Sequence, residues 1–129
     1  MTKKLNKKHR KRKITHNFGF YAEHFAMVYL WLKGYWILRH RYKYNGGDID
    51  IIAKKNNYLV FIEVKSSHFR MNSEKVLSDL QIDKIQDGAQ FFLERNQKLS
   101  NLKCRYDFIE VTTFLKIFLR IKHNVNFIS

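Results

Sequence analysis

The chain has 129 residues, which suits one domain able to bury roughly two-thirds of its unfolded surface. Its 25 Lys and Arg residues outnumber 11 Asp and Glu residues, and the resulting net charge of +14 favours a polyanionic partner such as nucleic acid. One cysteine excludes an internal disulfide, and no apolar run has transmembrane length, so we expect a cytoplasmic protein without a membrane partner.

The N-terminal segment is strongly basic. Residues 1–13 contain eight Lys or Arg residues and no acid. A run this polar cannot bury a core, so we predict a mobile basic arm over residues 1–16 and a folded domain over residues 17–129. The arm either contacts phosphate groups or is simply a solvated extension.

The rest of the chain alternates helical and extended patterns. Asn17 can cap a helix that Gly34 ends, and because this helix is apolar on both sides, we expect it to pack within the core. The order helix, three strands, helix, strand predicts an α/β fold with a mixed sheet. The expected strands cover residues 35–42, 49–53, 58–65 and 105–112, a second helix covers 73–95, and residues 114–121 form an edge strand or a short helix.

The segments around Asp50 and Glu63 predict a hairpin with charged residues inside it. A two-residue turn at Asn56 and Asn57 would place Asp50 directly opposite Glu63, with Lys65 on the same face. Opposed carboxylates with Cβ atoms roughly 4.5–5.5 Å apart repel each other. A divalent cation such as Mg²⁺ removes this conflict, because it accepts a site made of one or two carboxylates and several waters.

A plain surface hairpin with a weak ion pair would show the same spacing. Against this alternative, Phe61 precedes Glu63 on its own face and Ile52 follows Asp50 on its face, so both strands look covered. A covered carboxylate needs a partner. We also expect Asp107, within the last predicted strand, to be a structural acid that hydrogen-bonds a neighbour.

These residues resemble the motif of PD-(D/E)XK nucleases, in which an Asp is followed on the next strand by an acid-X-Lys. More narrowly, the chain resembles the YraN-type family of endonuclease-like proteins from about residue 17 onwards. The segments that carry this resemblance are Gly19–Glu23, Gly47–Asp50, Ile62–Lys65, Lys84–Ile85 and Arg105–Asp107. Asp48 stands where the family usually has glutamate, and His40–Lys43 replaces the usual Arg-Asn-Tyr-Arg segment.

The resemblance implies a restriction-endonuclease-like αβββαβ core and metal-dependent hydrolysis of nucleic acid, with DNA as the favoured substrate and branched or single-stranded DNA among the candidate forms. It implies Mg²⁺ or Mn²⁺ held by Asp50, Glu63 and the Val64 carbonyl, with Lys65 catalytic and Glu23 in support. The expected nucleic-acid contacts are Arg70, Lys84, Gln81, Arg41 and Lys43.

Three further questions stay open at this level. A protein that kept the fold but lost turnover would bind nucleic acid without cleaving it. A small basic protein held to ribosomes or to a membrane surface by its arm would show the same charge pattern. The oligomeric state is also open, with a homodimer among the arrangements.

Overall fold

The computed structural model describes residues 21–67, 79–114 and 118–128. The predicted basic arm, the Asn17 cap, the loop that contains Arg70 and the predicted start of the second helix at Ser73 lie outside these residues. No helix in the described ranges is both long and apolar enough to cross a membrane.

The described chain follows the predicted order of elements. A helix covers residues 21–32 and is called the N-terminal helix below. Gly34 follows it with a φ of +88°, a left-handed conformation that suits glycine where a helix ends. The other elements are β1 (Trp36–Tyr44), β2 (Gly47–Lys55), β3 (Tyr58–Ser67), α2 (Asp79–Arg95), the short 3-10 helix η2 (Gln97–Leu99), β4 (Lys103–Phe114) and β5 (Phe118–Asn124).

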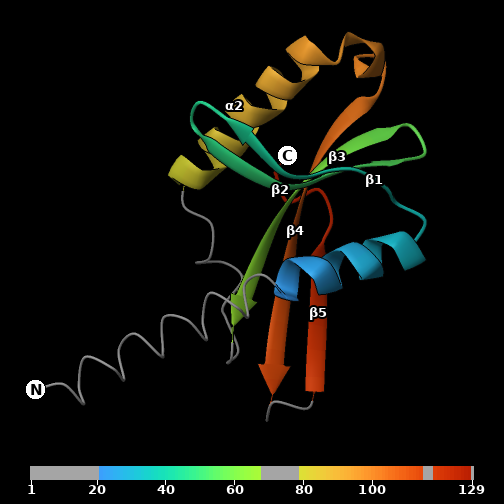
Figure 1. Cartoon of the computed structure of the whole chain (residues 1–129), viewed down its shortest axis with the longest axis vertical. Helices are drawn as coiled ribbons and strands as arrows, with labels where there is room; N and C mark the ends of the chain where they lie inside the picture. Colours follow the sequence, from blue (N-terminus) through green and yellow to red (C-terminus); the bar gives the residue numbers. More distant parts are fainter. Residues whose placement is uncertain (1–20, 68–78, 115–117, 129) are drawn as a thin grey trace, which may run out of the picture.

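The five strands form one mixed sheet in the order β1-β2-β3-β4-β5 (Figure 1). All neighbours are antiparallel except β3 and β4, which are parallel because α2 carries the chain back between them. This arrangement confirms the predicted α/β fold with a mixed sheet. The last segment is a strand, one of the two alternatives open from sequence.

The turn between β2 and β3 sets the register that the sequence predicts. β2 ends at Lys55 and β3 begins at Tyr58, so Asn56 and Asn57 form the loop. Asn56 has a φ of 52°, a left-handed conformation that asparagine tolerates better than most residues. The pairing of Ile51 with Ile62 follows from this turn and sets Asp50 and Glu63 at the next opposed positions.

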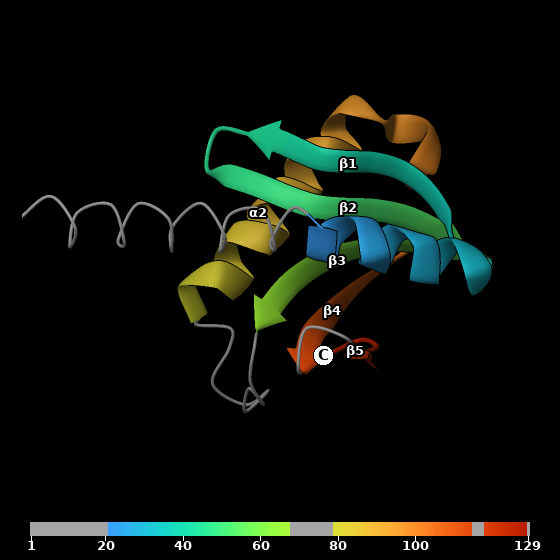
Figure 2. The same ribbon diagram turned by 60° about the horizontal axis from the view of Figure 1, so that its bottom comes forward.

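The N-terminal helix and α2 cover opposite faces of the sheet (Figures 1 and 2). One core cluster joins Ala22, Ala26 and Leu30 of the N-terminal helix to the sheet, and the other joins Ile85 and Phe92 of α2 to it. The outer side of the N-terminal helix is exposed, with Phe25 and Leu32 among its exposed residues. The expectation of a helix packed within the core therefore holds for one side only, because the other side does not meet the sheet.

Asp107 of β4 is fully buried at the centre of a charged network. It accepts hydrogen bonds from the Arg105 guanidinium at 3.0 and 2.8 Å and from the Asn126 amide at 2.9 Å, and it pairs with His123 Nε2 at 2.7 Å. Arg105 also donates to the Tyr35 hydroxyl at 2.6 Å. Burial acts to raise the pKa of Asp107, but the hydrogen bonds from His123 and Arg105 outweigh it and lower the pKa. Asp107 is thus the structural acid that the sequence predicted.

We predict that Asp107→Asn destabilises the domain by about 3 kcal/mol at neutral pH, because Arg105 loses its buried counter-charge. A carboxyl with a lowered pKa stabilises the fold above its ordinary pKa, and this contribution disappears as pH falls through the lowered value. The difference between parent and variant should therefore shrink in acid. Urea unfolding across pH measures it, with exposed Asp83→Asn as the control. Equal losses in the two variants would contradict this role.

Gly88 lets α2 approach β1 and β2 closely. A Cβ atom at this position would lie 2.6 Å from Cε1 of Tyr44 and 2.9 Å from Cδ1 of Ile49, closer than such atoms pack. The Tyr44 hydroxyl donates a hydrogen bond to the backbone carbonyl of Lys84, one helical turn earlier. This close contact fixes the N-terminal half of α2 beside the strands.

We expect Gly88→Ala to destabilise the protein by about 1 kcal/mol or more. Overpacking costs roughly 1–3 kcal/mol, whereas alanine in place of glycine stabilises a helix interior by about 1 kcal/mol. The steric cost should prevail because both neighbours are held in the sheet. Thermal unfolding compares Gly88→Ala with Gln90→Ala, an exposed position of the same helix. A Gly88→Ala variant as stable as its parent would show that α2 packs less tightly.

Candidate functional site

The candidate site lies where β2 and β3 separate. Their residue pairing extends from Lys55 and Tyr58 to Ile51 and Ile62, and beyond it β2 continues beside β1 while β3 continues beside β4 (Figure 1). At this fork the backbone amide of Val64 donates a hydrogen bond to Asp50 Oδ2 at 2.8 Å. A side-chain carboxylate thus occupies the place where a strand-to-strand bond would continue.

The three motif side chains come together at the fork. Lys65 Nζ lies 3.5 Å from Glu63 Oε1, and the two side chains are 30% and 18% exposed. Asp50 and Glu63 are close enough for their carboxyl groups to hydrogen-bond and to influence each other's charge. The alternative of a solvated surface hairpin is wrong, because both acids are largely covered.

Asp50 has an unusual affinity for its proton. Burial, followed by repulsion from Glu63, raises the pKa of Asp50 to about 8, against an ordinary value of 3.8. Burial also raises the pKa of Glu63, while Lys65 acts in the opposite direction. Near neutral pH Asp50 therefore keeps its proton, and a cation that replaced this proton would relieve the repulsion between the two acids.

Glu23 joins the site from the N-terminal helix. Its Oε2 lies 2.8 Å from His40 Nε2 and accepts a hydrogen bond from Arg41 Nε at 2.8 Å. Its charge acts on both Asp50 and Glu63 and raises their pKa values. Arg41 lies opposite Asp50 in β1 and has a φ of 53°, a conformation uncommon for this residue type. The predicted nucleic-acid contact Arg41 is thus held by Glu23.

A groove on the α2 side of the sheet brings in two more predicted residues. It encloses about 190 Å³ and is lined by Gln81 and Lys84 of α2, Glu63 of β3 and the turn before β2. Because Gln81 and Lys84 are three residues apart in a helix, they lie on the same side of α2 and line the groove together with Glu63. A ligand in the groove could contact both side chains. The remaining lining residues are Tyr44, Gly46, Gly47, Asp48 and Ile85.

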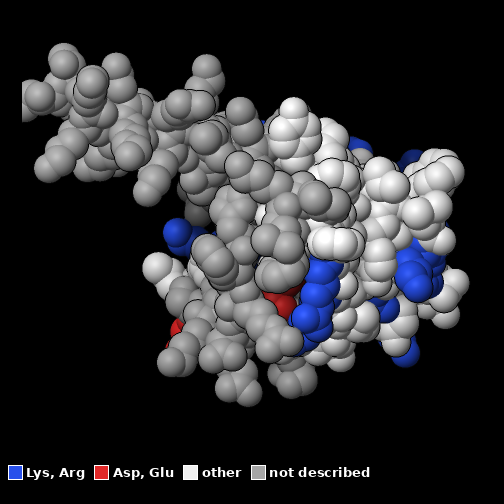
Figure 3. Space-filling model, turned by 90° about the horizontal axis from the view of Figure 1, so that it is seen from below, with Lys and Arg blue, Asp and Glu red and all other residues white. Residues whose placement is uncertain are grey.

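The other predicted contacts are less central. Lys43 is exposed on β1, where its partner in β2 is Asp48, and it does not line the groove. Arg70 lies outside the described residues. Val64 contributes its amide to Asp50. On the surface in Figure 3, a small group of acidic atoms lies directly beside a group of basic atoms.

Sequence reasoning missed three residues near the site. His40 and Tyr44 belong to β1, and only tertiary packing brings them to Glu23 and to α2. Glu110 of β4 is buried and pairs by register with Lys65 on one side and Lys122 on the other. Its Oε1 atom has no hydrogen-bond partner among the residues that the structure describes. Its sequence signal is an acid between the apolar residues Ile109 and Val111.

The acids suit a hard divalent cation in an incomplete site. Within residues 21–67, 79–114 and 118–128, no three His, Cys, Asp or Glu side chains converge closely enough to hold a metal ion alone. Asp50 and Glu63 provide two oxygen donors, and Mg²⁺ commonly binds through one or two carboxylates with water and substrate phosphate as its other ligands. The mutual repulsion of these acids is the feature that such an ion would relieve.

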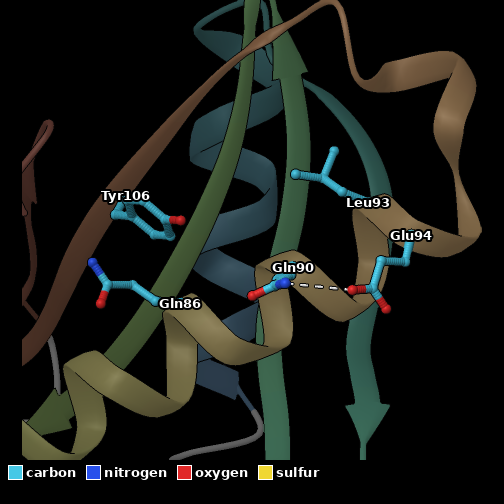
Figure 4. Close-up of a pocket in the computed structure, with 5 residues that line it drawn as sticks. All are labelled: Gln86, Gln90, Leu93, Glu94 and Tyr106. Carbon is cyan, nitrogen blue, oxygen red and sulfur yellow. Dashed lines mark hydrogen bonds between the residues drawn. The ribbon is translucent and has the colours of Figure 1, made fainter.

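A second hollow lies on another side of α2 and lacks this chemistry. It has a volume of about 490 Å³ between α2 and Tyr106 of β4, and Figure 4 shows Gln86 next to the Tyr106 ring. Gln90 Nε2 donates to Glu94 Oε1 at 3.4 Å. None of the predicted site residues within the described ranges lines this hollow, so the fork between β2 and β3 is the candidate site.

The element order, the mixed sheet and the acids at the fork define an α/β protein with a restriction-endonuclease-like core. The model of the uncharacterised protein family UPF0102 matches residues 22–111, and the chain belongs to this family, the YraN-type group that its motifs resemble. The matched range includes Glu23, Asp50, Glu63 and Lys65.

Individual relatives agree with this assignment. A UPF0102 protein of Ehrlichia chaffeensis is 42% identical over 103 residues, which cover 80% of this chain and 83% of the relative. A UPF0102 protein of Saccharophagus degradans is 39% identical over 97 residues, covering 73% and 81%. One of Rhizobium etli is 36% identical over 94 residues, covering 73% and 77%.

The raised pKa of Asp50 predicts an unusual dependence of stability on pH. Between the ordinary pKa of 3.8 and the folded value of about 8, the folded protein keeps a proton that the unfolded chain has released. The free energy of unfolding therefore falls as pH rises through this window. Asp50→Asn keeps an acceptor for the Val64 amide but cannot ionise, so this variant should lose less stability in base.

Thermal unfolding with a chelator present tests this expectation. At about pH 9, the free energy of unfolding of Asp50→Asn should exceed that of the parent by roughly 2 kcal/mol. At about pH 5 the two free energies should be nearly equal. The control is Asp83→Asn at an exposed position of α2. Parallel pH profiles for parent and Asp50→Asn would show that Asp50 ionises normally in the fold.

Proposed function

We propose that this protein is a metal-dependent nuclease that hydrolyses phosphodiester bonds of nucleic acid, with DNA as the favoured substrate. The observation that carries the proposal is the meeting of Asp50, Glu63 and Lys65 at the fork between β2 and β3. Two covered acids next to an amine suit chemistry on an anionic phosphate, since the acids can hold a cation and the amine can face the substrate.

Asp50 and Glu63 would hold Mg²⁺ or Mn²⁺, with the Val64 carbonyl as a third protein ligand. Such an ion, when bound, polarises a phosphoryl oxygen and lowers the pKa of a bound water. Two contacts keep the acids in place. The backbone amide of Val64 donates a hydrogen bond to Asp50, and the Lys65 amine lies beside Glu63. Both contacts involve residues of β3, and they would hold the acids in place before an ion binds.

Lys65 would orient the attacking water or stabilise the negative charge that develops on the phosphate. Its present distance of 3.5 Å from Glu63 keeps the amine beside the acids. Glu23 would support the site from the N-terminal helix, where His40 and Arg41 hold its carboxylate. His40 and Arg41 can position Glu23 without touching the substrate themselves.

Lys84 and Gln81 would contact the nucleic-acid backbone along the groove beside Glu63. Contacts of this kind position a strand without reading its sequence. The net charge of +14 supports long-range attraction of a polyanion and a binding strength that falls steeply with salt. Arg70 and the basic residues 1–13 would add further phosphate contacts.

Cleavage assays on linear, single-stranded and junction DNA test the proposal. Cleavage should require Mg²⁺ or Mn²⁺, and Lys65→Met and Asp50→Asn should each lower the rate roughly a hundredfold or more. Binding in a mobility assay should change little, because phosphate contacts along the groove remain. Lys98→Met and Glu94→Gln, at exposed positions near the other end of α2, are the matched controls.

Two outcomes would overturn this assignment. Equal cleavage by the parent and both site variants would place the activity elsewhere or in a contaminant. Salt-dependent binding without cleavage of any substrate, at any metal concentration, would favour the non-catalytic binding protein that shares this fold. Circular dichroism of each variant separates a lost reaction from a lost fold.

A further inference from the structure

Glu110 of β4 is a buried acid beside the candidate site, and the proposed mechanism does not use it. The residue is 5% exposed, and its Oε1 atom has no hydrogen-bond partner within the described ranges of the chain. A buried polar atom without a partner costs free energy, so its presence in a folded protein needs an explanation. The position of Glu110 next to Lys65 supplies one.

Glu110 lies on the same face of the sheet as Glu63 and Lys65. Its neighbours in β4, Ile109 and Val111, belong to the core cluster that includes the N-terminal helix. Because side chains alternate along a strand, Glu110 points to the opposite face, which α2 covers. Glu63 lines the groove beside α2, and Lys65, two residues further along β3, shares its face. The two acids and the amine are therefore neighbours on one surface of the sheet.

Lys65 has both Glu63 and Glu110 within reach of its side chain. Glu110 is its register partner across the parallel strands β3 and β4, which run side by side in Figure 1. Neighbouring strands lie about 4.8 Å apart, whereas two residues along one strand span roughly 6.6 Å. The Lys65 amine nevertheless lies beside Glu63, 3.5 Å from its Oε1 atom. An ordinary N–H···O hydrogen bond measures about 2.7–3.2 Å, so the contact with Glu63 is a loose one.

We propose that Glu110 is a positioning residue for the Lys65 amine, which moves from Glu63 to Glu110 when a divalent cation binds at the fork. The inference rests on the cation site of the proposed function. A cation bound to Glu63 would take up the carboxylate that Lys65 contacts now, and it would repel the positively charged amine. Glu110 offers a second acceptor of opposite charge, and the amine would donate a hydrogen bond to its Oε1 atom.

This transfer would serve both the cation and the amine. Glu63 would be left to the cation, without competition from Lys65. The amine would stay at the site instead of extending into solvent, because a lysine side chain without an anchor is free to change rotamer. Held between β3 and β4, Lys65 would remain next to a phosphate bound to the cation. The buried Oε1 atom of Glu110 would gain its missing partner in the same step.

A simple ion pair with Lys122 is the structural alternative for Glu110. Lys122 of β5 is the register partner of Glu110 on its other side. Lys122 is exposed, however, and ion pairs of a solvated amine contribute little to stability. The Oε1 atom of Glu110 also has no bond to it. The two roles give Glu110 different partners, so paired substitutions distinguish them.

Binding of Mn²⁺ to the full chain tests the proposal without a cleavage assay. Electron paramagnetic resonance of the free ion measures the Kd. Glu110→Gln keeps the size of the side chain but removes its charge, so Lys65 would stay on Glu63 and compete with the ion. This variant should bind Mn²⁺ about tenfold more weakly than the parent, whereas in a Lys65→Met background the same substitution should change the Kd less than about twofold. In a Lys122→Met background the loss should persist.

NMR of lysine ammonium groups follows the amine itself. The signal of Lys65 is assigned by its loss in Lys65→Met. Saturating Mg²⁺ should shift this signal in the parent and slow its exchange with water, and it should not do so in Glu110→Gln. On a DNA that the parent cleaves, Glu110→Gln should lower kcat about tenfold and leave KM unchanged, because the amine acts on the reacting phosphate and not on binding.

Several results would overturn the inference while leaving Mg²⁺-dependent cleavage, and thus the proposed nuclease, intact. These are an unchanged Kd in Glu110→Gln, an equal loss with and without Lys65, and a loss that Lys122→Met abolishes. If Glu110→Gln does not fold, the parent decides, since a Lys65 signal that Mg²⁺ leaves unchanged would also overturn the inference.

The same measurements show when the proposed function fails instead. Coupled Mn²⁺ binding without cleavage of any substrate would exclude the nuclease and support the transfer of Lys65 to Glu110. A parent that binds no Mn²⁺ would exclude both.

Discussion

The alignment of β2 with β3 is the constraint on which the candidate site depends. The short loop at Asn56 and Asn57 sets this alignment, and alternation along the strands then brings Asp50 to Glu63. A shift of one residue would turn one set of side chains to the opposite face of the sheet. The strands separate at these acids, so the hydrogen bond from Val64 to Asp50 marks the end of their shared ladder.

Two covered aspartates, Asp107 fully buried and Asp50 partly buried, show how the fold separates structural from chemical roles. Asp107 lies among Arg105, His123 and the Asn126 amide, and its pKa falls although it is fully buried. Asp50 has one backbone donor and an acidic neighbour, and its pKa rises to about 8. The first arrangement is complete within the protein. In the second, two acids face each other, and a proton or a cation relieves their repulsion, as expected where a protein binds a ligand.

Local rules predicted much of the fold and of the site. Turn residues and strand alternation give the positions of Asp50, Glu63 and Lys65, and helical spacing gives Gln81 beside Lys84. The hydrogen bond between His40 and Glu23 could not be predicted from the sequence. It depends on how the N-terminal helix packs across β1, whose pairing register shifts after Ile37. The exposure of one side of the N-terminal helix could not be predicted either, because a helix with apolar residues on both sides has the sequence pattern of a buried helix.

The fork draws its side chains from both layers of the domain. Glu23 belongs to the helix on one face of the sheet, whereas Gln81 and Lys84 belong to the helix on the other. A ligand bound there would contact elements from both core clusters. Because it binds only the folded state, it would raise the free energy of unfolding. Amide hydrogen exchange should then slow in both helices when the site is occupied. The fork would thus couple the stability of the N-terminal helix to that of α2.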